Sequence, residues 1–346
     1  MRVIFSIIAL SLLMGLSTML VPPMTEAAVI DDAADLATQQ AQEKQELDEM
    51  RQEIGNIKGT MREATQGMSE LHERVQQQQR AAAAAEVHLI AKEAAWEVAP
   101  GISTAAITYN GSLPGPVVRI KQGDTVRIVL HNQLKTPTSL YFHGMTLPHN
   151  VGGLPRKEAG LVNPGQTYGF SFVAEAPGTY WYHPQVMHGE QMARGLYGVI
   201  VVEPRSAKSY DKDVVLVLGQ SAAGPKQATY FTVNGKSAPA IPPIEVRNGE
   251  RVRLRILNAA FNACPLFLTG HRFEVINENG GDGLEPKVTR DTLTVQPGDR
   301  YDIEFTANNP GVWSLASVLP AQSSNEGKFP GGIAVVVRYP EALNLR

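Results

Sequence analysis

The sequence predicts an all-β body, a sandwich or a barrel built from two repeated units, preceded by a long α-helix. From about Val87 onward, short runs rich in Val, Ile, Tyr and Phe alternate with Gly, Pro and Asn turn signals. The segment 244–258, IEVRNGERVRLRILN, echoes the segment 117–132, VVRIKQGDTVRIVLHN, which indicates a duplicated domain. Residues 31–80 instead are rich in Gln, Glu, Ala and Met and contain no Pro.

Residues 1–27 have the layout of a secretory signal peptide. Arg2 precedes an apolar run from Val3 to Val21, and a small-residue end follows at Ala27. We therefore expect cleavage after Ala27 or Ala28 and a periplasmic or secreted protein. The apolar run is nearly long enough to span a bilayer. A retained, membrane-tethered form is the alternative, and only that form would place the chain at a membrane.

The segment 31–80 carries a heptad pattern that predicts an α-helical coiled coil. Its apolar residues alternate spacings of three and four over more than three heptads: Leu47, Met50, Ile54, Ile57, Met61, Ala64, Met68, Leu71 and Val75. Such a seam needs a partner to bury it, which favours a homo-oligomer. An amphipathic helix that folds back onto its own domain is the other interpretation.

Two β domains are expected at 87–205 and 209–342, joined by a linker near 204–211. The runs 126–132 and 168–175 alternate apolar and polar residues, as half-buried strands do. VQPGDRYDIEF at 295–305 also echoes VNPGQTYGFSF at 162–172, so the repeat extends through much of each domain.

Composition limits the classes of partner. The formal net charge is -3, which speaks against a nucleic-acid partner. The one cysteine, Cys264, cannot form an internal disulfide.

Several motifs resemble those of the multicopper oxidases. NGSLPGPVVRIKQGDTVRIVLHN, SLYFHGM, PGTYWYHPQ and GLYGVIVVEP resemble the family's first cupredoxin domain, while FTVNGKSAPAIPPIEVRNGERVRLRILNAA, LTGHRFEVI, VQPGDRYDIEF and PGVW resemble a later one. The resemblance covers roughly 91–339. It implies two Greek-key cupredoxin β-sandwich domains, as in two-domain laccases and copper nitrite reductases. Those relatives are homotrimers with copper between neighbouring subunits, and the N-terminal heptads fit a trimer without proving the number three.

The resemblance also indicates where copper ligands should lie in the first domain. The family places histidine pairs at alternate strand positions, so that both rings point to one face. The first pair, His-x-His-Gly in the family, reads Tyr141-Phe142-His143-Gly144 here, and the second reads His183-Pro184-Gln185. One imidazole of each pair is present.

In the second domain, the ligand positions implied by the resemblance hold other residues. The family's His-Pro-x-His-x-His-Gly-His resembles residues 264–271, with Cys264, Phe267 and Thr269 at ligand positions and His271 at the non-ligand one. The family's Trp-x-x-His-Cys-His-x-x-x-His matches Trp313 followed by Ala316, Ser317, Val318 and Gln322. Nitrite reductases carry their type 1 cysteine where Pro184 stands. Since a type 1 copper needs a thiolate and two imidazoles, we expect none, and we expect Cys264 to be a buried core residue.

The candidate metal ligands are therefore His143, His183 and His188. The first two resemble the pair of first-domain ligands to a type 2 copper, whose third ligand would come from a neighbour near Phe267. Further candidate donors, including soft ones suited to Cu(I), lie close in sequence: Tyr141, Gln185, Met187 and Met192. The alternative is that both histidines form hydrogen bonds in the interior. Three other histidines are expected at the surface: His72, His88 and His149.

Two functional hypotheses follow. The first is a secreted or periplasmic multicopper-oxidase-like protein that lacks type 1 copper and an intact trinuclear cluster. It would be a non-laccase scaffold or binding protein, self-associating and with a possible envelope protein partner, as copper-free relatives that act as cell-division scaffolds suggest. The second is a copper-binding protein or a mononuclear, type 2-like copper oxidoreductase with at most one copper site, using His143 and His183, with a neighbour's His188 or His271 as possible additional ligands.

Overall fold

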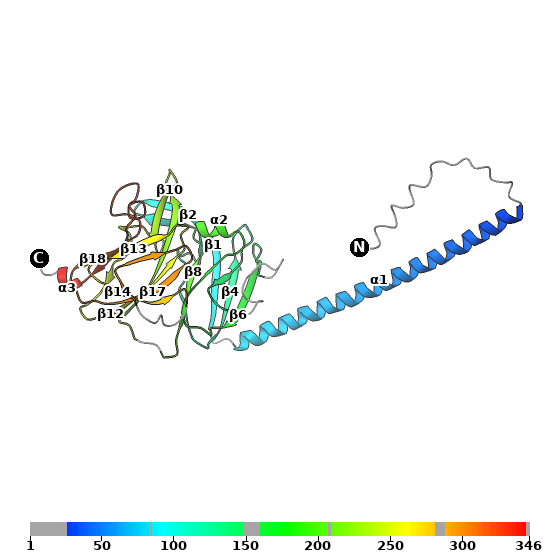
Figure 1. Ribbon diagram of the computed structural model, residues 1–346, viewed down its shortest axis with the longest axis horizontal. Coiled ribbons are helices and arrows are strands. Elements are labelled where there is room, and N and C mark those ends of the chain that lie inside the picture. Colours follow the sequence, from blue (N-terminus) through cyan, green and yellow to red (C-terminus); the bar gives the residue numbers. More distant parts are fainter. Residues whose placement is uncertain (1–25, 83–84, 148–159, 207–208, 281–287, 344–346) are drawn as a thin grey trace. The chain divides into compact units, whose positions relative to one another are not determined.

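The computed structural model describes residues 26–82, 85–147, 160–206, 209–280 and 288–343 (Figure 1). Contacts divide the chain into two compact units, Met1–Arg74 and Val75–Arg346, which we describe separately. Residues 1–25 of the predicted signal peptide lie outside the described residues, as does His149. Within the described ranges, no helix combines the length and the apolar character needed to cross a membrane.

The predicted N-terminal helix is confirmed as α1 (Glu26–Ala82), 57 residues long. At 1.5 Å per residue it extends for about 85 Å. Glutamine–glutamate pairs four residues apart, such as Gln45–Glu49, hydrogen-bond along its surface. The heptad seam is exposed in the single chain, from 45% at Leu47 to 70% at Met68. The coiled-coil partner of this seam stays a prediction.

Domain 1 is a sandwich of two four-stranded sheets, ordered β2-β1-β4-β6 and β3-β8-β7-β5. The apolar positions of its alternating strands face each other between the sheets and form one core. Its elements are β1 (Ala85–Ala99), β2 (Ile102–Tyr109), β3 (Val118–Lys121), β4 (Thr125–Asn132), β5 (Tyr141–His143), β6 (Thr167–Val173), β7 (Gly178–His183), α2 (His188–Ala193) and β8 (Gly198–Glu203).

Domain 2 repeats the sandwich with larger sheets, ordered β10-β9-β12-β17-β14-β15 and β11-β19-β18-β13-β16. A second apolar core lies between them. Its elements are β9 (Lys212–Ala223), β10 (Ala228–Val233), β11 (Ile244–Glu245), β12 (Arg251–Asn258), β13 (Cys264–Leu268), β14 (Phe273–Glu278), β15 (Val288–Arg290), β16 (Thr292–Val295), β17 (Arg300–Thr306), β18 (Val312–Ser317), β19 (Ala334–Arg338) and α3 (Pro340–Leu343). The all-β prediction is confirmed.

Two buried asparagines show that the sequence echo is a structural repeat. Asn132 ends β4 and Asn258 ends β12, and they are 1% and 0% exposed. Each amide donates to the carbonyl four residues ahead and to a carbonyl of the later echo, Val162 or Val295. Each amide oxygen accepts the N–H two residues ahead. The same side chain therefore closes the same turn in both domains.

The first sheet of domain 2 packs against domain 1. An apolar cluster joins Trp181, Val199 and Tyr197 of domain 1 to Val217 and Leu257 of domain 2. Tight packing of large apolar side chains here fixes one domain against the other.

A buried ion network adjoins that cluster. Arg255 is 2% exposed and donates to Asp213 at 2.8 Å and to Asp302 at 2.9 Å. Thr179, on β7 of domain 1, donates to Asp302 at 2.7 Å. Burial alone would raise the pKa of Asp213, but hydrogen bonds from Arg253 and Arg255 outweigh it and lower that pKa to about 2. Both carboxylates therefore have a cationic partner at the domain boundary.

Candidate metal centre

Two adjacent strands bring His143 and His183 together. In the antiparallel pair of β5 and β7, Tyr141 lies opposite His183 and His143 opposite Trp181. Side chains at these positions share one face of the sheet. As a result, Nδ1 of His143 lies 3.2 Å from Nε2 of His183. His183 is only 2% exposed, while His143 is half-buried.

The surroundings fix the orientation of the His183 ring. Its Nδ1 lies 2.9 Å from the carbonyl oxygen of Pro184. Because a carbonyl only accepts, Nδ1 carries the proton and Nε2 presents its lone pair toward His143. Trp181 packs on both imidazoles, with ring centroids 4.2 Å from His183 and 5.0 Å from His143, and Tyr141 meets both rings edge-on. Metal-binding histidines are commonly held in this way through their second nitrogen.

The separation of the two nitrogens fits one metal ion. Two nitrogens each about 2.0 Å from an ion lie about 3.2 Å apart when the angle between the bonds is about 105°. Across the residues that the structure describes, however, no group of three or more His, Cys, Asp or Glu side chains converges on a common point. His143 and His183 would therefore be the two described ligands of a metal bound here.

A buried cation adjoins the pair. Arg300, 4% exposed, packs against Gly144, where any Cβ would collide with the guanidinium. It donates to the backbone carbonyls of Thr179, Gly298 and Asn279. Burial lowers the pKa of Arg300. The guanidinium thus lies against the residue that follows His143, and its charge opposes a second positive charge at the histidine pair.

The other predicted donors are placed as follows. The backbone of His188 begins α2, but its side chain lies outside the described part of the chain. Met187 precedes the helix with φ +50° and is 39% exposed. Met192 is buried in the apolar cluster between the domains, so it is a packing residue. At Gln185, the backbone N–H donates to the Ser139 hydroxyl.

In domain 2, three residues at ligand positions expected from the sequence resemblance lie together and are connected by hydrogen bonds. Cys264, Ser317 and Gln322 are all at most 5% exposed. The Ser317 hydroxyl donates to Oε1 of Gln322 at 2.7 Å, and Gln322 donates to the carbonyl of Ala263 at 2.9 Å. Burial raises the pKa of Cys264 to about 12, although a hydrogen bond with Ser317 acts in the opposite direction. The thiol is protonated, and the prediction of a buried core cysteine is confirmed.

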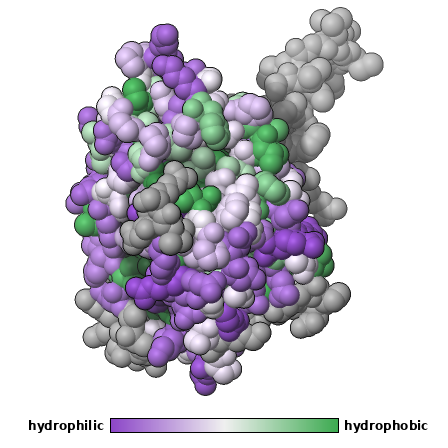
Figure 2. All heavy atoms as spheres, turned by 90° about the vertical axis from the view of Figure 1, so that its left-hand side faces the viewer, coloured by the Kyte–Doolittle hydropathy of each residue, from purple (hydrophilic) through white to green (hydrophobic). Residues whose placement is uncertain are grey.

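Other positions of the same motifs point outward from the second sheet of domain 2. Phe267 on β13 pairs with Ala316 on β18, and it is 36% exposed. Val318, just after β18, is 56% exposed. The end of the body near β13, β18 and α3 shows hydrophobic patches among hydrophilic side chains (Figure 2). Phe267 and Val318 therefore present apolar side chains at the surface of domain 2.

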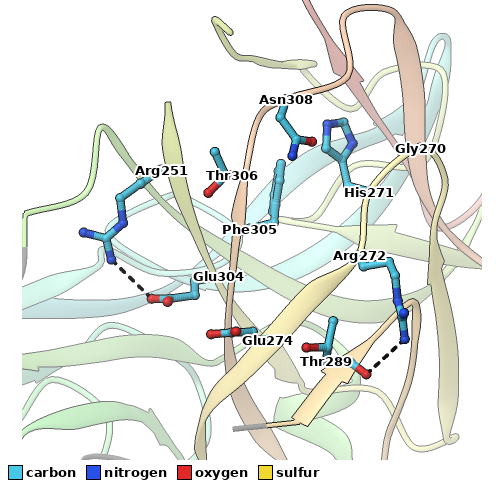
Figure 3. A pocket seen from close by; sticks show the side chains of 10 residues that line it. All are labelled: Arg251, Gly270, His271, Arg272, Glu274, Thr289, Glu304, Phe305, Thr306 and Asn308. Atoms are coloured by element: carbon cyan, nitrogen blue, oxygen red, sulfur yellow. Dashed lines mark hydrogen bonds and ion pairs between the residues drawn. The ribbon is translucent and has the colours of Figure 1, made fainter. Parts of the chain in front are cut away.

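His271 is a core histidine beside a polar cavity. Its Nε2 lies 2.8 Å from the hydroxyl of Tyr339, and the two rings stack at 9°. Burial lowers the pKa of His271. The cavity, about 560 Å³, is lined by two arginines and two glutamates, among them the ion pair of Arg251 and Glu304 (Figure 3).

Comparison with known proteins assigns the family. Residues 91–207 and 212–320 match two sequence profiles, both described as multicopper oxidase. The chain is 28% identical over 269 residues to multicopper oxidase MmcO of Mycobacterium tuberculosis, covering 65% of this chain and 52% of that protein. It is 29% identical over 255 residues to the copper-containing nitrite reductase of Neisseria gonorrhoeae, covering 66% of this chain and 62% of the reductase.

Solved structures agree. The blue copper oxidase of Nitrosomonas europaea superposes with a TM-score of 0.70 at 28% identity, covering 74% of this chain and 86% of that one. The chain spans only about half the length of MmcO, so the matches concern the two cupredoxin domains. With both domains matched in sequence and in fold, the chain belongs to the multicopper oxidase family.

Proposed function

We propose that this protein lacks a type 1 copper and an intact trinuclear cluster, and that it acts as a non-laccase scaffold or binding protein. The observation that carries the proposal is the Cys264–Ser317–Gln322 cluster. A type 1 copper transfers electrons through a thiolate and two imidazoles. At three positions that the motif resemblance aligns with copper ligands, this chain has a protonated thiol, a hydroxyl and an amide, and hydrogen bonds connect them. Such a cluster supplies no route for electrons into the protein.

The second candidate function is that of a mononuclear, type 2-like copper protein. The 3.2 Å separation of the His143 and His183 nitrogens favours it. Copper bound there would supply a redox-active Lewis acid. The two imidazoles would hold the ion, the carbonyl of Pro184 would keep His183 in the binding tautomer, and Trp181 and Tyr141 would limit the access of water. Arg300 weakens this candidate, because its charge opposes that of the ion.

Self-association and export belong to the same proposal. The exposed heptad seam of α1 and the outward side chains of Phe267 and Val318 support a homo-oligomer, with a trimer as the expected state. The N-terminal residues support a periplasmic or secreted protein. An envelope protein is the expected class of further partner.

Metal analysis separates the two functions. The full-length protein, produced with copper and then desalted, is expected to retain no more copper than the His143→Ala, His183→Ala double variant and to show no oxidase activity toward phenols. A tightly bound copper that disappears in the His143→Ala, His183→Ala double variant would establish the mononuclear candidate instead. A thiolate-to-copper absorption band would contradict both.

The oligomeric state is tested in the helix. Ile54→Asp with Met61→Asp places two charges in the seam, and light scattering is expected to show a monomer. Gln52→Asp, off the seam, is the matched control and keeps the oligomer. An unchanged mass for the seam variant would show that α1 does not hold the assembly.

A further inference from the structure

The outward face of the first sheet of domain 1 carries a second histidine pair. His88 lies on β1 and His131 lies on the neighbouring parallel strand β4. Nδ1 of His88 is 2.8 Å from Nε2 of His131, and the rings stack at 26° with centroids 5.1 Å apart. The His88 side chain is 53% exposed. The strand register therefore holds two imidazole nitrogens together where an ion can reach them.

Each ring is held at its other nitrogen by a polar side chain. Nε2 of His88 lies 3.1 Å from a carboxylate oxygen of Glu86, and Nδ1 of His131 lies 3.0 Å from the Thr167 hydroxyl. A carboxylate on the second nitrogen orients a metal-binding imidazole and makes it more basic. Arg127, 3.4 Å from the second oxygen of Glu86, restrains the carboxylate. The pair thus has the supporting contacts that a metal site needs.

The domain repeat indicates that the fold does not require these histidines. Glu86 lies opposite Arg127 in domain 1, as Asp213 lies opposite Arg253 in domain 2. Counting on from these pairs, His88 corresponds to Val215 and His131 corresponds to Leu257. The same sheet forms in domain 2 with apolar residues at both positions. A sheet of this kind therefore forms without histidines at these two positions.

We propose that His88 and His131 form a bidentate surface site for a divalent transition metal, with Cu(II) preferred. Two nitrogens about 2.0 Å from one ion and 2.8 Å apart subtend an angle of about 90°. That angle suits the square-planar geometry of Cu(II) and Ni(II), and Cu(II) ranks highest in affinity among these metals. Water would complete the coordination.

Binding requires a change of tautomer and a rotation of the two rings that turns both lone pairs toward the ion. In the metal-free pair, His88 donates from Nε2 to Glu86, and His131 donates from Nε2 to Nδ1 of His88. When the His131 proton lies on Nδ1, the Thr167 oxygen accepts it, and Nε2 of His131 becomes available. Both imidazoles then present a lone pair to the ion while remaining neutral. The nearby Glu86 carboxylate adds attraction for a cation.

Copper titration tests the site in a background without the buried pair. The untagged full-length chain carrying His143→Ala and His183→Ala is titrated with Cu(II), and affinity is followed by calorimetry and electron paramagnetic resonance. His88→Ala and His131→Ala are each expected to weaken binding at least tenfold, because a chelate becomes a single ligand. Glu86→Gln should weaken it about tenfold. Lys121→Ala, an exposed change in the other sheet of domain 1, is the control.

The outcomes are distinct. Single histidine variants that bind Cu(II) within twofold of the parent would overturn the proposal, as would tighter binding of Zn(II) than of Cu(II). The melting temperature of each variant should stay close to that of the parent, because the His88 side chain is 53% exposed and those of His131 and Glu86 are partly exposed. Loss of binding in the His88 and His131 variants leaves the question of His143 and His183 unaffected, since the background lacks them.

Discussion

Domains 1 and 2 present the same sheet face to different surroundings. In domain 1 the face that contains Glu86 and Arg127 is partly exposed, from 14% for the side chain of Arg127 to 53% for that of His88, and it also carries His131. In domain 2 the equivalent face is covered by domain 1. It carries Val217 and Leu257 in the apolar cluster and the buried Arg255 in the ion network. The strand pairing is the same in both domains. The difference in burial therefore decides which side chains each face can carry and what they can bind.

Replacing Leu257 on the covered face with histidine, the residue at the equivalent position of domain 1, should cause the largest loss of stability. Leu257 is 0% exposed, and Leu257→His would remove its apolar contacts and bury an imidazole among apolar side chains. We expect a loss of about 5 kcal/mol in the free energy of unfolding. Urea unfolding measures it. A loss below about 1 kcal/mol would mean that the domain boundary is not tightly packed.

Removal of the buried guanidinium should rank next. Arg255→Ala leaves Asp213 and Asp302 without a partner that reaches both, and breaking a buried pair in this way costs about 3 kcal/mol. Arg127→Ala on the partly exposed face of domain 1 removes one longer contact, 3.4 Å to Glu86, and should cost less, about 1.5 kcal/mol. Equal losses in the two variants would contradict the assignment of the difference to burial.

Part of this comparison could be predicted from the sequence. The echo between 117–132 and 244–258 predicted two copies of one frame, and the matching contacts of Asn132 and Asn258 confirm it. Strand alternation also predicts which residues share a face. It does not predict which face the other domain covers, because the domain 1 residue that Arg255 contacts, Thr179, lies 76 residues away in the sequence.

The two histidine sites were predictable to different degrees. His143 and His183 were selected only because their motifs resemble a known family. The burial of Cys264 followed from the ordinary behaviour of a free cysteine. For His88, the sequence predicted a surface position and nothing more. His131 lies 43 residues away, and the parallel register of β1 and β4 that joins them leaves no local motif.

Removal of the equivalent asparagine should lower the free energy of unfolding by the same amount in both domains. Asn132→Ala and Asn258→Ala each leave one buried carbonyl, one partly buried carbonyl and one buried N–H without the amide. We expect a loss of about 2 to 3 kcal/mol for each variant. Chemical unfolding of the two variants in parallel is the measurement. A difference above about 1.5 kcal/mol would show that the two frames are not equivalent.

Acid should weaken the covered face through Asp213. An unfolded aspartate titrates near 3.9, whereas the folded pKa is about 2. Because the folded value is lower, the charged form stabilises the fold, and this contribution is complete above about pH 5 and lost as the pH falls through about 2. It amounts to about 2 kcal/mol. Burial raises the pKa of Asp302, so the contribution of Asp302 to stability changes with pH in the opposite direction. The informative quantity is therefore the difference between the wild type and Asp213→Asn, which should shrink across this range.

The smallest effect on stability is expected from the reverse exchange. His88→Val with His131→Leu gives the partly exposed face of domain 1 the residues of the covered face. Both side chains are partly or largely exposed, and the domain 2 strands accept these residues, so unfolding free energy should change by about 0.5 kcal/mol or less. Cu(II) binding in the His143→Ala, His183→Ala background should fall at least tenfold in the same protein. The variant would then lose Cu(II) binding while keeping its stability, which would show that the two histidines serve binding and not folding. A large loss of stability would instead show that the His88–His131 hydrogen bond is a structural requirement of domain 1.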